Sequence, residues 1–246
     1  MKVSIITATY NSAATLSDTL ASLEAQTYSN IEYIIIDGAS KDGTVELAKS
    51  QCSRIAKLVS EPDKGIYDAL NKGIALATGD IVGFLHSDDI LAYPDAIEDL
   101  VSCFCTGSYD AIYADLDYVS KDDMEKVIRH WVSGPFDEKK LAWGWMPPHP
   151  TFYMKKEFYE QFGGFNLSYQ IAADYDSILR YLKNNSLKVV YNSNVLIKMR
   201  VGGTSNNSIK NVMRKIKEEK LIMKDNGLFY PYALIMKRLS KIHQFL

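Results

Sequence analysis

The chain has 246 residues, of which 47% are hydrophobic and 24% are charged, proportions typical of an ordinary globular protein. Its formal net charge of −2 argues against broad nucleic-acid binding, and no apolar run approaches the roughly 20 residues that a membrane-spanning helix needs. The three cysteines (Cys52, Cys103 and Cys105) form no CxxC pair, which argues against a disulfide framework or zinc site and fits a reducing cytoplasm.

The first half of the chain alternates short apolar runs with amphipathic segments. Its opening, MKVSIITATY, lacks the long apolar region and cleavage site of a signal peptide, so we expect it to form a strand. Leu16, Leu20 and Leu23 share one face of the helix expected next. Runs rich in Ile and Val are typical of parallel strands covered on both faces, and we place them at 3–8, 31–37, 56–60 and 80–85.

The pattern changes after residue 90, where we expect mixed α and β structure. The later elements predicted are a helix at 94–105, a hairpin at 110–132, helices at 155–163 and 172–185, a strand or strand pair at 187–200, and a helix at 207–224. No Gly/Ser linker divides the chain. We therefore expect one domain at 1–205, with a nucleotide-binding half (1–100) and an acceptor half (101–205), followed by a helical extension at 206–246.

Polar residues follow each of the first four predicted strands. The strand ends read TATYN, DGAS, SEPDKG and HSDD, and three of the four carry a carboxylate. Because the carboxyl ends of parallel strands meet at one sheet edge, these loops should converge on a ligand. Neither GxGxxG nor GxxxxGK[ST] is present, which argues against a dinucleotide dehydrogenase or a P-loop enzyme. Gathered carboxylates suit Mg²⁺ or Mn²⁺ instead, with Asp88 holding the ion and the ion holding a diphosphate.

Two long stretches carry a resemblance to a known family. The segments TATYNSAATLSDTLASLEAQTYSNIEYIIIDGASKDGT and EPDKGIYDALNKGIALATGDIVGFLHSDD resemble family 2 glycosyltransferases, and the similarity extends over roughly residues 1 to 200. PHPTFY and ADYD are similar to the subset that builds bacterial exopolysaccharide, O-antigen and capsule. The resemblance implies the α/β GT-A fold, a Rossmann-like, mixed and mostly parallel sheet flanked by helices.

The resemblance also implies roles for individual residues. His86 stands where the family has the first acid of Asp-X-Asp, and Asp88 matches the metal-ligating acid, while Asp89 is either a supporting acid or a helix cap. The donor would contact Thr7, Ala8, Tyr10, Asp37, Asp63, Lys64, Asn71, His86, Ser87 and Arg200. Of these, Arg200 is expected on a mobile glycine-containing loop at 199–207.

Catalysis needs a base near the acceptor hydroxyl. The family usually supplies it from an acidic pair at a helix start, where this chain has Ala173 and Asp174, so Asp174 is the expected base and Asp176 the next candidate. The alternative is that Asp174 only caps its helix. His149, in a proline-rich loop, and Trp145 beside it are expected to contact the acceptor or the diphosphate.

The resulting hypothesis is an inverting, metal-dependent glycosyltransferase of hexosyltransferase type. It would move one sugar from a nucleotide diphosphate, most often UDP in the family, to a hydroxyl of a glycan or lipid-linked acceptor. Residues 210–246 hold nine Lys or Arg against three Asp or Glu, a net of +6. This basic extension suggests contact with the inner face of the membrane; a homodimer contact and a solvated helix face are the alternatives. Two other functions stay open, a non-catalytic nucleotide-sugar-binding protein and a sugar-1-phosphate nucleotidyltransferase.

Overall fold

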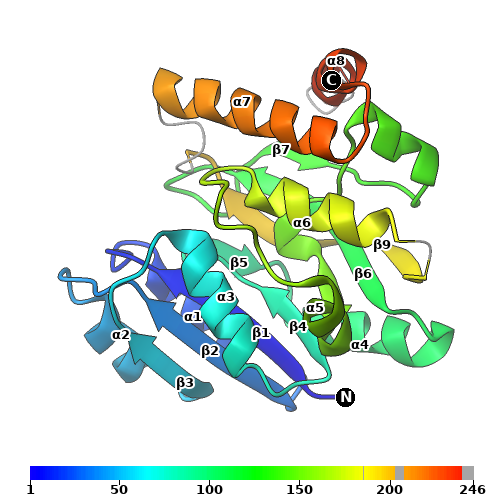
Figure 1. Ribbon diagram of the computed structural model, residues 1–246. Helices are drawn as coiled ribbons and strands as arrows, with labels where there is room; N and C mark the ends of the chain where they lie inside the picture. Colours follow the sequence, from blue (N-terminus) through cyan, green and yellow to red (C-terminus); the bar gives the residue numbers. More distant parts are fainter. Residues whose placement is uncertain (185, 203–207, 240–246) are drawn as a thin grey trace.

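One mixed β-sheet runs through the molecule (Figure 1). The computed structural model describes residues 1–184, 186–202 and 208–239, and in these ranges the strands lie in the order β3-β2-β1-β4-β8-β6-β9-β5, with β7 paired to β6. The strands are β1 (Val3–Thr9), β2 (Ile31–Asp37), β3 (Ile55–Ser60), β4 (Ile81–Phe84), β5 (Asp89–Leu91), β6 (Ala111–Val119), β7 (Val127–Trp131), β8 (Tyr153–Lys155) and β9 (Val189–Arg200). The first four in the spatial order are parallel, and β8 joins β4 to β6 in the antiparallel direction.

Helices cover both faces of this sheet. They are α1 (Leu16–Glu24), α2 (Thr44–Gln51), α3 (Ile66–Leu76), α4 (Ala96–Gly107), α5 (Lys156–Phe162), α6 (Ala173–Leu182), α7 (Ile209–Asp225) and α8 (Tyr230–Leu239), with 3₁₀ helices η1 (Glu138–Trp143) and η2 (His149–Thr151). One core packs α3, α5 and α6 against one face of the sheet, and a second packs α1, α2 and α4 against the other. The result is a three-layer α/β architecture.

The alternation of side chains along β2 explains the two cores. Ile34 and Ile36 lie in the core beneath α3, whereas Tyr33 and Ile35 lie in the core beneath α1. Each strand residue points to the opposite face from its neighbour, so a strand that is apolar at every position must be covered twice. This confirms the predicted parallel, doubly covered strands of the first half.

Most predicted elements are confirmed within a few residues, including the hairpin, which is formed by β6 and β7. The short strand β5 was not predicted. It pairs antiparallel with β9, and Asp89 is its first residue, so the helix-cap interpretation of Asp89 is wrong. Residues 203–207 of the expected mobile loop lie outside the described residues.

The C-terminal helices pack onto the end of the molecule that carries η1 and α6 (Figure 1). Ile222, Met223 and Ala233 are buried and belong to the same core as α6. The approach of α8 is close at Gly144, where an added Cβ would lie 2.9 Å from the carbonyl oxygen of Ala233 and the backbone φ is +71°. Glycine is therefore needed at this position. Within the described ranges, no helix is both long enough and apolar enough to cross a bilayer.

Candidate active site

Asp37 ties together three of the loops at the carboxyl edge of the sheet. Its buried carboxylate accepts hydrogen bonds from Thr9 Oγ1 (2.9 Å), Ser60 Oγ (2.7 Å), and the backbone N–H (2.9 Å) and Oγ (2.5 Å) of Ser40. Burial raises the pKa of Asp37, but these hydrogen bonds outweigh it and hold the pKa below its ordinary value. Because four protein donors already use the carboxylate, Asp37 organises the ends of β1, β2 and β3, and the predicted direct contact to the donor gains no support.

Tyr10 and Asp63 meet beside Asp37, at Gly38. A Cβ added to Gly38 would lie 2.6 Å from Oδ2 of Asp63 and 3.2 Å from Cδ2 of Tyr10. The Tyr10 side chain is 68% exposed, Asp63 is half-buried, and the neighbouring Lys64 is exposed. An open aromatic ring and a carboxylate over a glycine can stack on a planar base and accept hydrogen bonds from it. Sequence reasoning missed Gly38, although it lies inside the DGAS motif.

The HSDD turn follows β4 at the same edge. The Asp89 backbone N–H donates to the carbonyl of His86 (3.1 Å), and the hydroxyl of Ser87 donates to Ser12 Oγ (3.0 Å), which holds the turn against the loop after β1. Asp88 is half-buried, and within the described ranges no side chain or backbone group donates a hydrogen bond to its carboxylate. Asp88 therefore presents an unengaged carboxylate at the edge.

The adjacent Asp89 resolves the repulsion between two neighbouring acids. Its side chain is fully buried, and burial first, then the charge of Asp88, raises its pKa well above the usual range. The neutral acid is thus favoured at Asp89, whereas the half-buried Asp88 keeps its carboxylate at the sheet edge. Arg200 opposes this rise but does not overcome it.

Facing the turn are His149 and Asp174, which come from the second half of the chain. The rings of His86 and His149 have centroids 5.8 Å apart, and the charge of Asp174 acts on both imidazoles. Burial is the main cause that lowers the pKa of His86 and lowers that of His149 to about 4, so both rings are neutral near pH 7. Neither His86 Nδ1 nor His149 Nε2 has a hydrogen-bond partner in the described ranges.

Asp174 lies at the start of α6 with one oxygen engaged. Oδ1 accepts hydrogen bonds from the backbone N–H of Tyr175 (2.8 Å) and from the hydroxyl of Tyr67 (3.3 Å), which comes from α3. No donor in the described ranges reaches Oδ2. The single proton of the Tyr67 hydroxyl is shared between Asp174 Oδ1 and the nearer carbonyl of Ile171 (2.8 Å), so Tyr67 links α3 to the loop before α6. Tyr67 was not among the predicted site residues.

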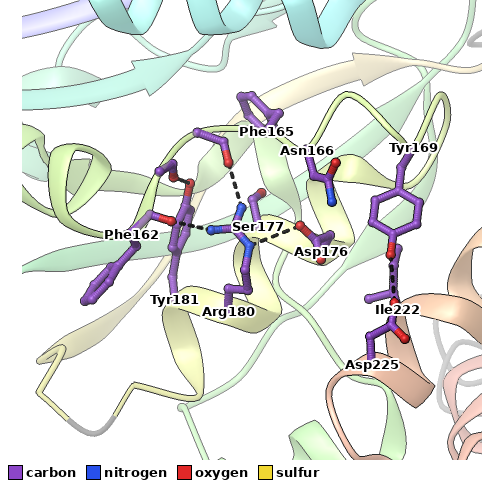
Figure 2. Close-up of polar contacts among 12 residues, drawn as sticks. Phe162, Phe165, Asn166, Tyr169, Asp176, Ser177, Arg180, Tyr181, Ile222 and Asp225 are labelled. Carbon is purple, nitrogen blue, oxygen red and sulfur yellow. Dashed lines mark hydrogen bonds and ion pairs between the residues drawn. The ribbon is translucent and has the colours of Figure 1, made fainter.

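Asp176, the alternative base, is occupied by an ion pair (Figure 2). Arg180 Nε lies 3.1 Å from Asp176 Oδ2, and the other guanidinium nitrogens donate to the carbonyls of Phe162 (2.5 Å) and Gly164 (2.6 Å). The Asp176 side chain is buried. This geometry favours Asp174 over Asp176 as the group available to an acceptor.

Several predicted donor contacts lie elsewhere. Thr7 is fully buried, with its hydroxyl donating to the carbonyl of Leu85 (2.6 Å), and Ala8 packs in the core beneath α3. Asn71 uses both ends of its amide on the backbone of Phe165, at 2.8 and 2.9 Å. These three side chains face the protein interior or another loop, so the structure gives no support to donor contacts through them.

Arg200 and Trp145 also differ from expectation. Arg200 is the last residue of β9 and not part of a mobile loop; it is buried and pairs with Asp18. This ion pair already engages the guanidinium, so the predicted contact of Arg200 with the diphosphate gains no support. Trp145 is half-buried and packs its ring against Tyr113 and Phe136, so it belongs to the packing of the second half.

Comparison with known proteins identifies the family of this chain. The family model for "Glycosyl transferase family 2" matches residues 4–165. This chain belongs to glycosyl transferase family 2. Among its relatives, a glycosyltransferase of Mycobacterium tuberculosis is 36% identical over 180 residues, which is 72% of this chain and 68% of the relative. A "PGL/p-HBAD biosynthesis glycosyltransferase" of Mycobacterium bovis is 31% identical over 194 residues, 76% of this chain and 72% of the relative.

Solved structures agree with the GT-A fold of this family 2 glycosyltransferase. S. aureus TarS 1–349 in complex with UDP-GlcNAc aligns with a TM-score of 0.73 at 15% identity, covering 96% of this chain and 70% of that one. The mannosyltransferase PcManGT from Pyrobaculum calidifontis, in complex with GDP-Man and Mn²⁺, aligns with a TM-score of 0.66 at 18% identity, covering 97% and 73%. The chain spans 42% of the longer TarS chain. The predicted fold and enzyme class are thus confirmed.

The protein offers few side-chain ligands for a metal ion at this edge of the sheet. In the described ranges, no three His, Cys, Asp or Glu side chains gather into a ligand set. A Mg²⁺ or Mn²⁺ ion commonly takes only one or two carboxylates and completes its shell with substrate phosphates and water. The unengaged carboxylate of Asp88 fits that arrangement, in which the donor itself supplies most of the ligands.

Proposed function

We propose that this glycosyltransferase transfers a single sugar from a nucleotide diphosphate donor to an acceptor hydroxyl, with inversion at the anomeric carbon. The observation that supports the proposal most is that the charges of Asp88, after β4, and of Asp174, from the second half of the chain, both act on His86, while Tyr10 and Asp63 meet at Gly38. The nucleobase of the donor would lie between Tyr10 and Asp63. TarS with UDP-GlcNAc and PcManGT with GDP-Man support a nucleotide-sugar donor through their shared fold.

The chain's residues would act together in one displacement. The acceptor oxygen attacks the anomeric carbon as the bond from that carbon to the diphosphate breaks, and the bond's electron pair leaves with the diphosphate. The acceptor proton passes to Oδ2 of Asp174, the oxygen left without a donor. Mg²⁺ or Mn²⁺ bound by Asp88 would neutralise charge on the leaving diphosphate. The neutral His149, whose Nε2 has no partner in the described ranges, would donate to a phosphate oxygen.

Donor hydrolysis tests this proposal without knowledge of the acceptor. A thermal-shift screen of UDP-, GDP- and dTDP-sugars with Mn²⁺ selects the donor, and release of nucleoside diphosphate then measures turnover. We expect Asp88→Asn to lose the Mn²⁺ dependence and Asp174→Asn to lower the rate by about 10³-fold or more. A wild-type protein that binds a nucleotide sugar but transfers it to neither water nor any acceptor would overturn the catalytic proposal in favour of a binding protein.

We also propose that the acceptor is lipid-linked and that the C-terminal helices bring the enzyme to an anionic membrane surface. On α7, Ile209 and Met213 are 82% and 67% exposed and lie four residues apart, on one face. Exposed apolar side chains flanked by Lys and Arg are typical of helices that lie in the membrane interface. The M. bovis relative, named for PGL/p-HBAD biosynthesis, supports a role in cell-surface glycan or glycolipid assembly.

Vesicle flotation separates this contact from its rival, a homodimer. The protein is expected to float with phosphatidylglycerol vesicles, and an Ile209→Ser/Met213→Ser variant is expected to stay in solution with unchanged donor hydrolysis. Wild-type protein that ignores such vesicles but forms a concentration-dependent dimer, lost in the same variant, would favour the dimer contact.

A further inference from the structure

Glu218 on α7 holds the segment that leads into α6. Its carboxylate accepts hydrogen bonds from three consecutive backbone N–H groups, those of Gln170 (3.0 Å), Ile171 (2.9 Å) and Ala172 (3.0 Å). The Glu218 side chain is 8% exposed. A buried carboxylate with three amide donors is strongly fixed, because hydrogen bonds to a charged group are stronger than neutral ones.

This contact holds the three residues that precede α6, a helix whose own N-cap makes no side-chain hydrogen bond. The N-cap residue, Ala172, has no side chain able to accept a hydrogen bond, and the first amides of a helix have no partners within the helix. Glu218 supplies a negative charge at this helix start from a position 46 residues later in the chain, where the helix dipole also favours it. Asp174 is two residues beyond Ala172, so its place depends on this anchor.

The other end of the same segment is anchored separately. Asn71 on α3 holds the backbone of Phe165, and Tyr169 in between contacts Asp225 of α7 at 3.3 Å (Figure 2). The stretch from Phe165 to Ala172 is therefore fixed at both ends. Its first anchor belongs to the donor half and its second to the C-terminal extension.

The helix that carries Glu218 is itself locked in place. The next residue, Glu219, is buried and pairs with Lys237 of α8 at 3.0 Å. The Lys237 ammonium lies 3.2 Å from the ring centroid of Tyr175, which immediately follows Asp174. Both carboxylates thus face inward on α7, so Glu218 cannot move away from the segment without breaking this buried pair.

We propose that Glu218 is a positioning residue for the transfer reaction: it fixes the start of α6 and thereby holds Asp174 at the acceptor. The inference rests on the proposed role of Asp174 as the base. Glu218 contacts segment 170–172, and its effect would pass through the backbone. Small displacements of a reacting group cost large factors in rate, on the order of 100-fold for about 1 Å.

Replacing Glu218 by glutamine tests this directly. The amide keeps the shape but offers one acceptor oxygen and turns an N–H₂ group toward backbone donors, so the segment must shift. We expect kcat for donor hydrolysis to fall about 10- to 100-fold, while the Kd for UDP-GlcNAc, or whichever donor the screen selects, changes less than about 3-fold. Glu218→Asp, which keeps the charge on a shorter side chain, should recover part of the rate.

Glu32→Gln is the matched control. Glu32 is also a buried carboxylate with several donors, including Ser4 Oγ (2.6 Å) and the Thr78 N–H (2.7 Å), but it lies at the opposite end of the strands. Its substitution should lower the melting temperature without lowering kcat. If Glu218→Gln loses stability but keeps the rate of Glu32→Gln, Glu218 is only structural and the inference is wrong. If Glu218→Gln fails to fold, the same comparison is made with Glu218→Asp.

A double variant distinguishes this inference from the proposed function. When Glu218 acts through Asp174, Glu218→Gln should have little further effect in an Asp174→Asn background. Full additivity of the two losses would overturn the positioning role. An Asp174→Asn protein with wild-type activity would instead refute the base assignment itself, whatever the result for Glu218.

Discussion

Replacing Gly38 by alanine tests the donor pocket with a single methyl group. The new Cβ would lie 2.6 Å from Oδ2 of Asp63, whereas ordinary contacts begin near 3.4 Å. The carboxylate must then retreat by roughly 0.8 Å. Gly38 is not in the left-handed backbone region, so alanine adds no backbone strain and the variant should fold. Under the proposed function Asp63 accepts a hydrogen bond from the nucleobase, and losing one such charged hydrogen bond costs about 1.5–3 kcal/mol.

The expected result is a Kd for UDP or GDP that rises about 10- to 100-fold, with kcat changed by less than about 3-fold. Isothermal titration calorimetry measures the first and donor hydrolysis at saturating donor the second. Gly79→Ala is the control: its Cβ would meet Ser4 Oγ at 2.7 Å, at the opposite sheet edge, so it should lower stability and leave Kd unchanged. If Gly38→Ala weakens binding even when Asp63 is already alanine, the clash with Asp63 is not the cause and the pocket is misassigned.

Three further outcomes follow from the same geometry. Asp176→Asn removes the charge that pairs with Arg180 and should cost about 1–3 kcal/mol of unfolding free energy while activity persists; loss of turnover comparable to that of Asp174→Asn would contradict the choice of base. His149 should lower stability in acid, because its pKa is near 6.5 in the unfolded chain and about 4 in the folded protein. The free energy of unfolding should therefore fall by up to about 3 kcal/mol as the pH drops from 6.5 to 4. Urea titrations of His149→Gln should lack that part of the fall. Tyr67→Phe removes a 3.3 Å bond to Asp174 and should lower kcat about 3- to 10-fold at constant Kd for nucleotide, whereas an unchanged kcat would show that this hydroxyl does not orient the base.

Strands and helices of the first half were predictable because their apolar patterns are local. A strand buried on both faces, such as Ile31–Asp37, is apolar at nearly every position, and Leu16, Leu20 and Leu23 mark the face of one helix. The strand β5 has only three residues and gains its pairing from β9, far away in sequence, so no local pattern marks it. Arg200 was placed in a loop for a similar reason, since it ends β9 by pairing with Val119 of β6, which is also far away in sequence.

In the site, too, the sequence indicated which residue types are present but not which groups each side chain contacts. Sequence order predicted Asp63 and Asp88 at strand ends of one parallel sheet, and in the structure the charges of Asp88 and Asp174 both act on His86. It did not reveal that Asp37 has all its acceptor positions filled by Ser40, Ser60 and Thr9. These hydrogen bonds depend on how the residues after β1, β2 and β3 fold against one another. Glu218 had no sequence signal at all: an acid in a mostly basic helix resembles a solvated residue until its three amide partners are known.

The C-terminal helices therefore cannot be treated as a detachable membrane tail. One face of α7 exposes Ile209 and Met213 beside basic residues, and another buries Glu218 and Glu219 against the segment before α6 and against α8. Deleting the extension would remove the proposed membrane contact and also uncover the core around Ile222. Loss of activity in a truncated chain would thus say nothing about membranes, because it is expected from either cause. Only substitutions confined to the exposed face, with donor hydrolysis measured in the absence of lipid, separate the two.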